Sequence, residues 1–257
     1  MKTIENNFLQ YWYTTIKPGT PDDLVVKWRD YVLSGIQRGA DLVESIKLYI
    51  NLDGSKVLDA GCGYGGASIA FSLAGCRVVG IDISNQYLRG AQIRAREDFG
   101  INNILFQNSS LEMLPFPSET FDIIIGSDVI EHVNNQEASV YEISRVLKHN
   151  GIAFLSFPNR FSPQNFMSDP HYGLFGVSVL PRRLASWYVT QFLHRSYSYS
   201  VGHFPISNNL RKLFLRNGLN VNFENSLSEM KFGAIRNIYN IVLSNTRAFT
   251  SWIIKKY

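Results

Sequence analysis

Cysteines, charged residues and long apolar runs are all scarce in this sequence. The two cysteines, Cys62 and Cys76, show no Cys-x-x-Cys spacing, which argues against a disulfide framework and against a structural zinc site. No apolar run reaches the roughly 18 residues that span a bilayer. Residues 1–10 also lack the apolar centre of a signal peptide. We therefore expect a cytoplasmic protein.

The composition is that of a folded domain with a mild charge. Charged residues make up 18% of the chain, below the roughly 25% typical of soluble domains, and apolar residues make up 45%. The formal net charge of +4 is not concentrated in a basic stripe, so a nucleic-acid partner is not favoured. A chain of 257 residues with this composition predicts one domain with one core.

The spacing of apolar residues divides the chain into segments. It predicts N-terminal helices near 22–36 and 40–50, and then an alternation of short β-rich and helical segments. The predicted strands are 56–60, 77–81, 103–107, 121–126 and 151–157, and the helices between them are 66–74, 84–98 and 137–147. This alternation predicts βαβ units and a mainly parallel sheet. A looser stretch, 158–203, precedes a helix near 206–216, a strand near 219–223 and a last amphipathic helix over 232–254.

A glycine-rich turn follows the first predicted strand. Gly61, Gly63 and Gly66 there match the Gly-x-Gly-x-x-Gly spacing of dinucleotide-binding turns, a weak signal on its own. Asp59 lies two positions before Gly61, where a carboxylate would repel a pyrophosphate but attract the ammonium and sulfonium groups of S-adenosylmethionine. Asp82 ends the second predicted strand, where a carboxylate can accept hydrogen bonds from ribose hydroxyls. The alternative is that these residues only form a tight turn and helix caps.

Several motifs in order carry a family resemblance. Asp59-x-Gly61-x-Gly63, Asp82, the run LEMLPF at 111–116 and the run FDIIIGSDVIEHV at 121–133 together resemble class I S-adenosylmethionine-dependent methyltransferases. The resemblance implies a Rossmann-like, doubly wound, mainly parallel seven-stranded α/β sheet with one antiparallel edge strand. From the order of the segments we expect N-terminal helices (1–54), a cofactor-binding core (55–157), an acceptor-side insert after the fifth strand (158–203) and a C-terminal part (204–257). The implied cofactor-binding residues are Asp59, Gly61, Cys62, Gly63, Gly65, Asp82, Ile83, Ser110, Leu111 and Ser127. Ser110 stands where the family usually has an acidic residue.

Polar residues after the fourth predicted strand are the candidates for chemistry. Asp128, Glu131 and His132 follow this strand at the sheet edge where ligands bind in open α/β sheets. With Pro158-Asn159-Arg160 and His171 they resemble ubiquinone-pathway and small-RNA O-methyltransferases. We predict that His132, assisted by Glu131 or His171, activates the acceptor as a base or in a metal site. The resemblance implies a divalent metal held by carboxylates and histidines. Asp128 stands where these families usually have a glutamate, and its side chain is shorter, so no metal is assigned. Local packing of His132 is the alternative.

The motifs that are absent favour an oxygen acceptor. Neither Asn-Pro-Pro-Tyr nor Asp-Pro-Pro-Tyr follows the fourth strand, and there is no Pro-Cys nucleophile. We therefore expect O-methylation of a small-molecule, lipid-linked or glycan-linked hydroxyl. The insert also resembles methyltransferases of polysaccharide and lipid pathways, so peripheral membrane contact stays open. A nicotinamide-dependent oxidoreductase and a cofactor-binding module without turnover are the alternatives. The aromatic candidates for the lining of an acceptor pocket are Tyr11, Trp12, Tyr172, Phe175 and Trp187. The alternative is that these side chains only pack in the core.

Overall fold

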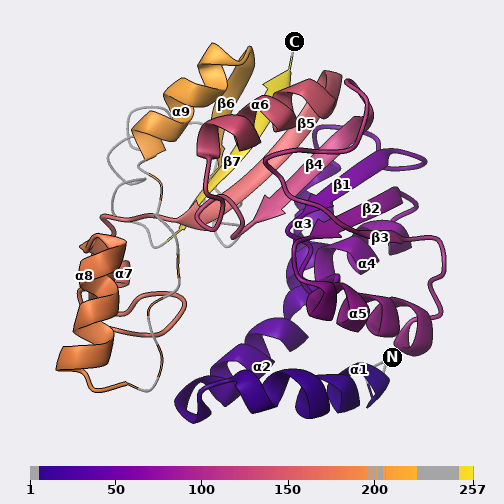
Figure 1. Ribbon diagram of the computed structural model, residues 1–257. Coiled ribbons are helices and arrows are strands. Elements are labelled where there is room, and N and C mark those ends of the chain that lie inside the picture. Colours follow the sequence, from indigo (N-terminus) through magenta and orange to yellow (C-terminus); the bar gives the residue numbers. More distant parts are fainter. Residues whose placement is uncertain are drawn as a thin grey trace.

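A seven-stranded sheet forms the centre of the computed structural model, which describes residues 6–195, 197, 199, 201, 205, 207–224 and 249–256. The strand order is β3-β2-β1-β4-β5-β7-β6, and all the pairs from β3 to β5 are parallel (Figure 1). The strands are β1 (Lys56–Ala60), β2 (Arg77–Asp82), β3 (Leu105–Asn108), β4 (Phe121–Ser127), β5 (Leu147–Pro158), β6 (Leu219–Glu224) and β7 (Phe249–Lys256). The predicted α/β fold class is confirmed.

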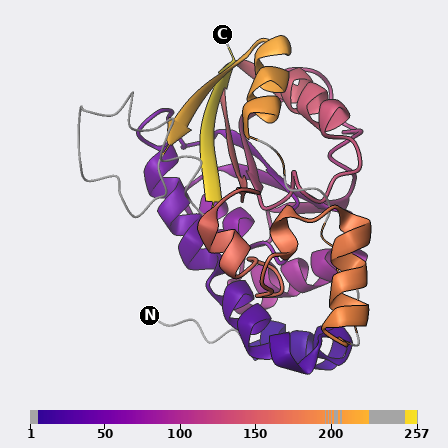
Figure 2. The same ribbon diagram turned by 90° about the vertical axis from the view of Figure 1, so that its left-hand side faces the viewer.

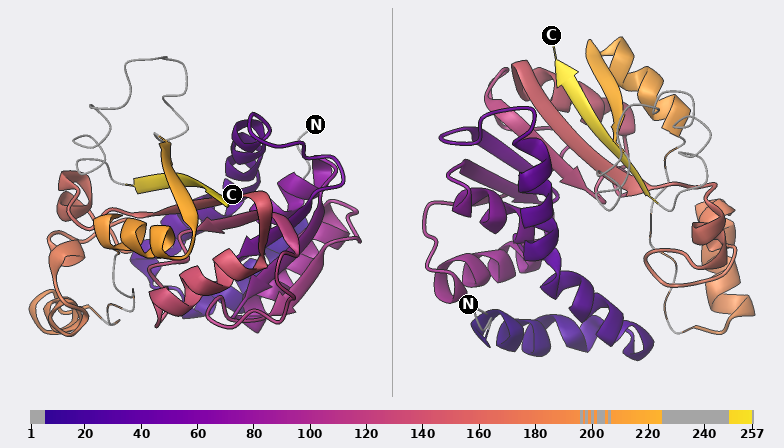
Figure 3. Two further views of the ribbon diagram at one scale, coloured as in Figure 1. Left: turned by 90° about the horizontal axis from the view of Figure 1, so that it is seen from above. Right: turned by 180° about the vertical axis from the view of Figure 1, so that it is seen from behind.

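Helices cover both faces of the sheet, because alternate strand residues point to opposite sides. Leu58 and Ile124 pack with α6 and α9 on one face, while Val57 and Ile123 pack with α3 and α4 on the other. Figure 1 shows α6 and α9 in front of the sheet, and the right view of Figure 3 shows α3 on the reverse side. The helices of the central layers are α3 (Gly35–Ile46), α4 (Gly66–Leu73), α5 (Asn85–Ile93), α6 (Gln136–Val146) and α9 (Ser207–Arg216).

The contact between α3 and α4 explains one glycine of the turn after β1. A Cβ on Gly66 would lie 2.6 Å from the backbone carbonyl carbon of Gly35, closer than real Cβ atoms approach. Gly66 therefore allows the two helices to pack closely, whatever the turn binds.

Two additional groups of helices lie beyond the carboxyl ends of the parallel strands. One is N-terminal, with α1 (Asn6–Tyr11) and α2 (Val25–Leu33), and the other is in the insert, with α7 (Pro163–Met167) and α8 (Arg182–Trp187). Figures 1 and 2 show both groups below the sheet, with the insert beneath β5. None of the helices in the described part of the chain has the length and apolar character needed to cross a bilayer.

The C-terminal part differs from the sequence prediction. Residues 249–254 are not helical but belong to strand β7, and residues 232–248 of the predicted helix lie outside the described residues. β7 runs antiparallel between β5 and β6, so the antiparallel strand lies one place inside the edge, and β6 is the edge strand. β5 also begins four residues before the predicted start at Gly151, and β3 begins at Leu105 rather than 103.

Candidate functional site

The glycine turn connects β1 to α4 at the carboxyl end of the sheet. Gly63 has φ +51°, a left-handed conformation that favours glycine, and a Cβ placed on it would meet nothing within 4 Å. Open space therefore lies beside the backbone of the turn, as a bound cofactor would require. A Cβ on Gly61 would lie 2.6 Å from the Val129 side chain, so this turn directly contacts the segment that follows β4.

Asp82 holds the glycine turn against the end of β2. Its Oδ2 accepts a hydrogen bond from the Gly63 amide (3.0 Å), and its Oδ1 accepts one from the Ser84 amide (2.8 Å). Burial raises the pKa of the Asp82 carboxyl, and the backbone donors partly oppose this. Each carboxylate oxygen keeps a further acceptor position. Ile83, beside it, is 75% exposed.

Asp59 lies deeper than its position in the motif suggests. Its side chain is only 4% exposed, and its Oδ2 accepts a 2.6 Å hydrogen bond from the Ser68 hydroxyl of α4. Burial raises the pKa of this carboxyl to about 6, with the Ser68 hydrogen bond acting in the opposite direction. Asp59 therefore ties β1 to α4, and its predicted place near the amino-acid part of a cofactor stays a prediction.

The other predicted cofactor residues also lie at the carboxyl ends of the strands. Ser110 uses its hydroxyl locally, accepting from the Glu112 amide at 3.1 Å. Leu111 is buried in the core, and Ser127 is exposed at the end of β4. Cys62 is buried and free, and its amide donates to Ile81 (2.9 Å). Their roles toward a cofactor stay predictions.

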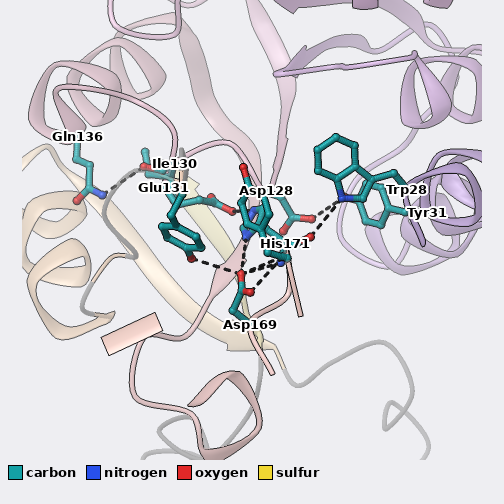
Figure 4. Close-up of polar contacts among 10 residues, drawn as sticks. Trp28, Tyr31, Asp128, Ile130, Glu131, Gln136, Asp169 and His171 are labelled. Carbon is teal, nitrogen blue, oxygen red and sulfur yellow. Dashed lines mark hydrogen bonds and ion pairs between the residues drawn. The ribbon is translucent and has the colours of Figure 1, made fainter. Parts of the chain in front are cut away.

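Glu131, His132 and His171 come together beyond the end of β4, as the sequence predicted for a shared role. One ligand-type atom from each lies within 4.8 Å of the other two. The His171 Nε2 is 3.8 Å from the Glu131 Oε1, and the two imidazole rings meet edge to face with centroids 5.2 Å apart. Figure 4 shows the labelled His171 and Glu131 close together, with Asp169 below them. The insert thus contributes directly to this cluster.

Two carboxylates at this site, Glu131 of the cluster and the neighbouring Asp128, have buried oxygen atoms without a hydrogen-bond partner in the described residues. Glu131 is 0% exposed, and neither of its oxygens has a hydrogen-bond partner within the described residues. Asp128 has a φ of +55°. Its Oδ2 accepts a 2.7 Å hydrogen bond from the Tyr31 hydroxyl of α2, whereas its buried Oδ1 accepts no hydrogen bond from any of the described residues. Burial raises the pKa of both carboxyls. Buried acceptors of this kind require a donor or a cation.

The surroundings of both histidines favour the neutral imidazole. Burial lowers the pKa of His171 to about 3, with the nearby His132 and Lys27 acting in the same direction. Partial desolvation also lowers the pKa of His132, which remains exposed to solvent on one side. Near pH 7 both imidazoles therefore keep a lone pair, which can accept a proton or bind a metal. One carboxylate and two neutral imidazoles form a donor set that fits a divalent cation, although the sequence assigned no metal.

Asp169 fixes the loop that carries His171, and sequence reasoning did not assign it a role. Its buried carboxylate accepts hydrogen bonds from the amides of His171 (3.1 Å), Tyr172 (3.1 Å) and Leu174 (2.9 Å). The His171 carbonyl in turn accepts a 3.2 Å hydrogen bond from the Trp28 indole of α2 (Figure 4). An aspartate followed by proline is a typical turn signal, and this signal could have identified the loop.

Comparison with known proteins agrees with this geometry. Residues 58–155, from β1 into β5, match the family model of the methyltransferase domain. The chain therefore carries a class I S-adenosylmethionine-dependent methyltransferase domain. The match begins at the strand before the glycine turn and includes Asp82, Glu131 and His132.

Relatives and solved structures extend the comparison to methyltransferases of several kinds. The chain is 31% identical over 166 residues to a ubiquinone biosynthesis O-methyltransferase of Albidiferax ferrireducens, covering 62% of this chain and 64% of that protein. It is 33% identical over 133 residues to the ubiquinone/menaquinone biosynthesis C-methyltransferase UbiE of Shewanella sp. (strain W3-18-1), covering 50% and 52%. The fold matches an S-adenosylmethionine-dependent methyltransferase from Mesorhizobium loti with a TM-score of 0.58 and 15% identity, covering 83% and 96%.

The methyltransferase domain is the part shared with these proteins. The chain spans about half the length of the curated relatives that it matches, from 44% to 64% among the first three. The relatives include both O- and C-methyltransferases, so the family does not fix the acceptor atom.

Proposed function

We propose that this protein transfers the methyl group of S-adenosylmethionine to a hydroxyl oxygen of a small-molecule, lipid-linked or glycan-linked acceptor. The observation that carries the proposal is the cluster of Glu131, His132 and His171 at the carboxyl end of β4. The glycine turn contacts the Val129 side chain, between Asp128 and the cluster. The glycine turn and the cluster are therefore neighbouring parts of the proposed site.

The cofactor would lie along the glycine turn. Gly61 to Gly65 would back it, and the free acceptor positions of Asp82 would hold its ribose hydroxyls. The open space beside Gly63 fits a bound group. When bound, S-adenosylmethionine supplies an activated methyl on a sulfonium sulfur.

The residues of the cluster would act on the acceptor. In the transfer, the bond from methyl carbon to sulfur would break as the bond from methyl carbon to acceptor oxygen forms, and S-adenosylhomocysteine would be the leaving group. The hydroxyl proton passes to His132 Nδ1 or Nε2, or to the Glu131 carboxylate, whose raised pKa makes it a stronger base. Holding the oxygen in line with the carbon–sulfur bond accounts for much of the acceleration.

The same residues fit a divalent cation. Glu131, His132 and His171 would hold it, and the unpartnered oxygens of Glu131 support this assignment. A bound cation would lower the pKa of a coordinated hydroxyl. The base and the metal versions use the same residues, so an experiment has to separate them.

Release of S-adenosylhomocysteine in the presence of hydroxyl compounds tests the proposal, with product mass spectrometry to distinguish O- from C-methylation. We expect His132→Ala to lower turnover by about 10² to 10⁴ while S-adenosylmethionine affinity changes little. His149→Ala is the matched control, because His149 pairs with Glu119 on the exposed surface, away from the cluster. Chelation abolishes turnover only in the metal version, in which His171→Ala behaves like His132→Ala. Full turnover of His132→Ala would refute both versions.

Titration calorimetry addresses the alternatives. Binding of NADH rather than S-adenosylmethionine would support the oxidoreductase alternative, and cofactor binding with no S-adenosylhomocysteine released from any acceptor would support a binding module. The family match of residues 58–155 favours the methyltransferase.

A further inference from the structure

An apolar groove of about 430 Å³ lies on the insert, outside the cluster at β4. Its lining is almost entirely apolar, and the side chains that form it include Phe166, Phe175, Val179, Leu180, Leu184 and Trp187. The volume lies within the range of about 300–1,000 Å³ that is typical of ligand sites.

The walls of the groove are fixed by packing beneath them. Ala185 of α8 and Val177 are fully buried in a small separate core, and Leu174 is 7% exposed. On the outer side, Leu184 is 53% and Trp187 is 58% exposed. The exposed apolar surface therefore belongs to an ordered, packed unit, and contiguous surface of this kind usually marks a binding site.

One loop connects the groove to the cluster at β4. Phe166 and Gly176 close this loop with a 2.7 Å hydrogen bond from the Gly176 amide to the Phe166 carbonyl. Both residues line the groove, and His171 lies midway between them in the sequence. At about 3.5 Å per residue, the loop places His171 at most about 17 Å from the groove. A single elongated molecule can therefore reach both.

The surroundings of the groove are positively charged. In the described residues from 158 to 195, Asp169 is the one acidic residue, and it is buried. Arg182 and Arg183 are exposed at the start of α8, beside Leu184. Arg160 donates to the carbonyl of Val179 (3.0 Å) at the groove wall. An anionic group on the ligand would complement these guanidinium groups.

We propose that the groove binds the hydrocarbon chain of an anionic amphiphile, and that this amphiphile is the methyl acceptor. The chain lies against Leu184 and Trp187, the acidic group lies near Arg182 and Arg183, and the hydroxyl end reaches the loop tip at His171. The assignment of the amphiphile as acceptor rests on the proposed function, whereas the binding of the chain does not.

Chain length gives a quantitative expectation. Each methylene group that enters the groove contributes about 0.8 kcal/mol, which is about fourfold in affinity. Affinity therefore rises with chain length and stops rising once the groove is full. A bilayer surface would give no such dependence for dispersed ligands.

Hexyl, octyl and decyl phosphate, each below its critical micelle concentration, are the probes, and calorimetry with the full chain measures their binding. We expect affinity to increase along the series, and Leu184→Asp to weaken decyl phosphate binding at least about tenfold. An aspartate near the beginning of α8 is compatible with the helix. The matched control, Leu48→Asp, changes a 68% exposed leucine away from the groove and should bind like the native chain. Replacing Arg182 and Arg183 by glutamine should weaken phosphate probes about tenfold and leave decanol binding unchanged.

Three results would overturn the inference: no binding of the alkyl phosphates, equal loss in Leu184→Asp and Leu48→Asp, or binding only to phosphatidylglycerol vesicles. The last would assign the groove to a membrane surface. S-adenosylmethionine binding and S-adenosylhomocysteine release are measured in the same samples. Groove binding without methyl transfer to any hydroxyl amphiphile refutes the acceptor assignment, whereas methyl transfer to short hydroxyl compounds without groove binding refutes only the groove.

Discussion

Replacing Asp169 tests how the insert positions the cluster at β4. This carboxylate is 0% exposed and accepts from the amides of His171, Tyr172 and Leu174, as well as from the Tyr199 hydroxyl at 3.4 Å. Within the described residues, no hydrogen bond or ion pair joins Asp169 to the glycine turn or to Glu131. Asp169 is therefore a positioning residue, which acts through His171.

The expected magnitude follows from those contacts. Hydrogen bonds to a charged group contribute about 1.5–3 kcal/mol each, and they do not add fully. His171 and Tyr172 are only partly buried, so their released amides can reach water after a small movement of the loop. We therefore expect Asp169→Ala to lower the free energy of unfolding by about 3 kcal/mol. Asp169→Asn keeps one side-chain acceptor oxygen and should lose about half as much.

Urea unfolding followed by circular dichroism gives the stability, and release of S-adenosylhomocysteine gives the turnover. In the metal version of the site, we expect the turnover of Asp169→Ala to fall by about 10² or more, because His171 loses its orientation, while S-adenosylmethionine affinity stays within twofold. Asp122→Ala is the control: Asp122 accepts from Lys148 and the Lys56 amide at the opposite end of the strands. It should lose stability and keep turnover. Native turnover and stability in Asp169→Ala would refute the reasoning.

Two further predictions concern the core of the domain. Asp82→Ala should weaken S-adenosylmethionine binding by about 1.5–3 kcal/mol with the fold intact, since hydrogen bonds to a charged group are lost; unchanged affinity in calorimetry would contradict the ribose assignment. Arg145→Ala should lower stability by about 1–2 kcal/mol, because Arg145 forms an ion pair with Glu142 (2.7 Å) and holds the carbonyl of Phe116. Hydrogen bonding from Arg145 lowers the pKa of Glu142 in the folded protein. The ion pair therefore stabilises the folded state at pH values above the ordinary glutamate pKa, and this stabilisation is lost as the pH falls through the lowered pKa. The free energy of unfolding should therefore fall more steeply with decreasing pH in the native chain than in Arg145→Ala. An equal pH dependence in the two proteins would argue against a stabilising ion pair.

Local patterns predicted most of the sheet. Strands β1, β2 and β4 and helices α4, α6 and α9 lie close to the positions that apolar spacing indicated. The pattern failed at β7, where Trp252, Ile253 and Ile254 are all buried. β7 lies between two strands with both faces covered, so polar and apolar residues do not alternate, and helical spacing fits it equally well.

The candidate site was predictable only where its residues are close in sequence. The run after β4 indicated Glu131 and His132, and the glycine turn indicated Asp82 through the order of strands. The hydrogen bond from Tyr31 to Asp128 joins residues 97 positions apart, and the hydrogen bond from Trp28 to His171 joins residues 143 apart. No local pattern specifies such pairs, because they depend on where α2 and the insert pack.

These long sequence separations have a consequence for synthesis on the ribosome. The aromatic side chains of α2 emerge early, but Trp28 meets its partner only after His171 has been translated, and the hydrogen bond between Tyr197 and Asp23 spans 174 positions. A nascent chain that ends after β5 already contains the glycine turn and Asp82, yet lacks His171 and the Asp169 loop. Because contacts between distant residues form late, cofactor affinity should precede acceptor chemistry during folding. A stalled or truncated chain would then bind the methyl donor next to an acceptor site that still lacks His171.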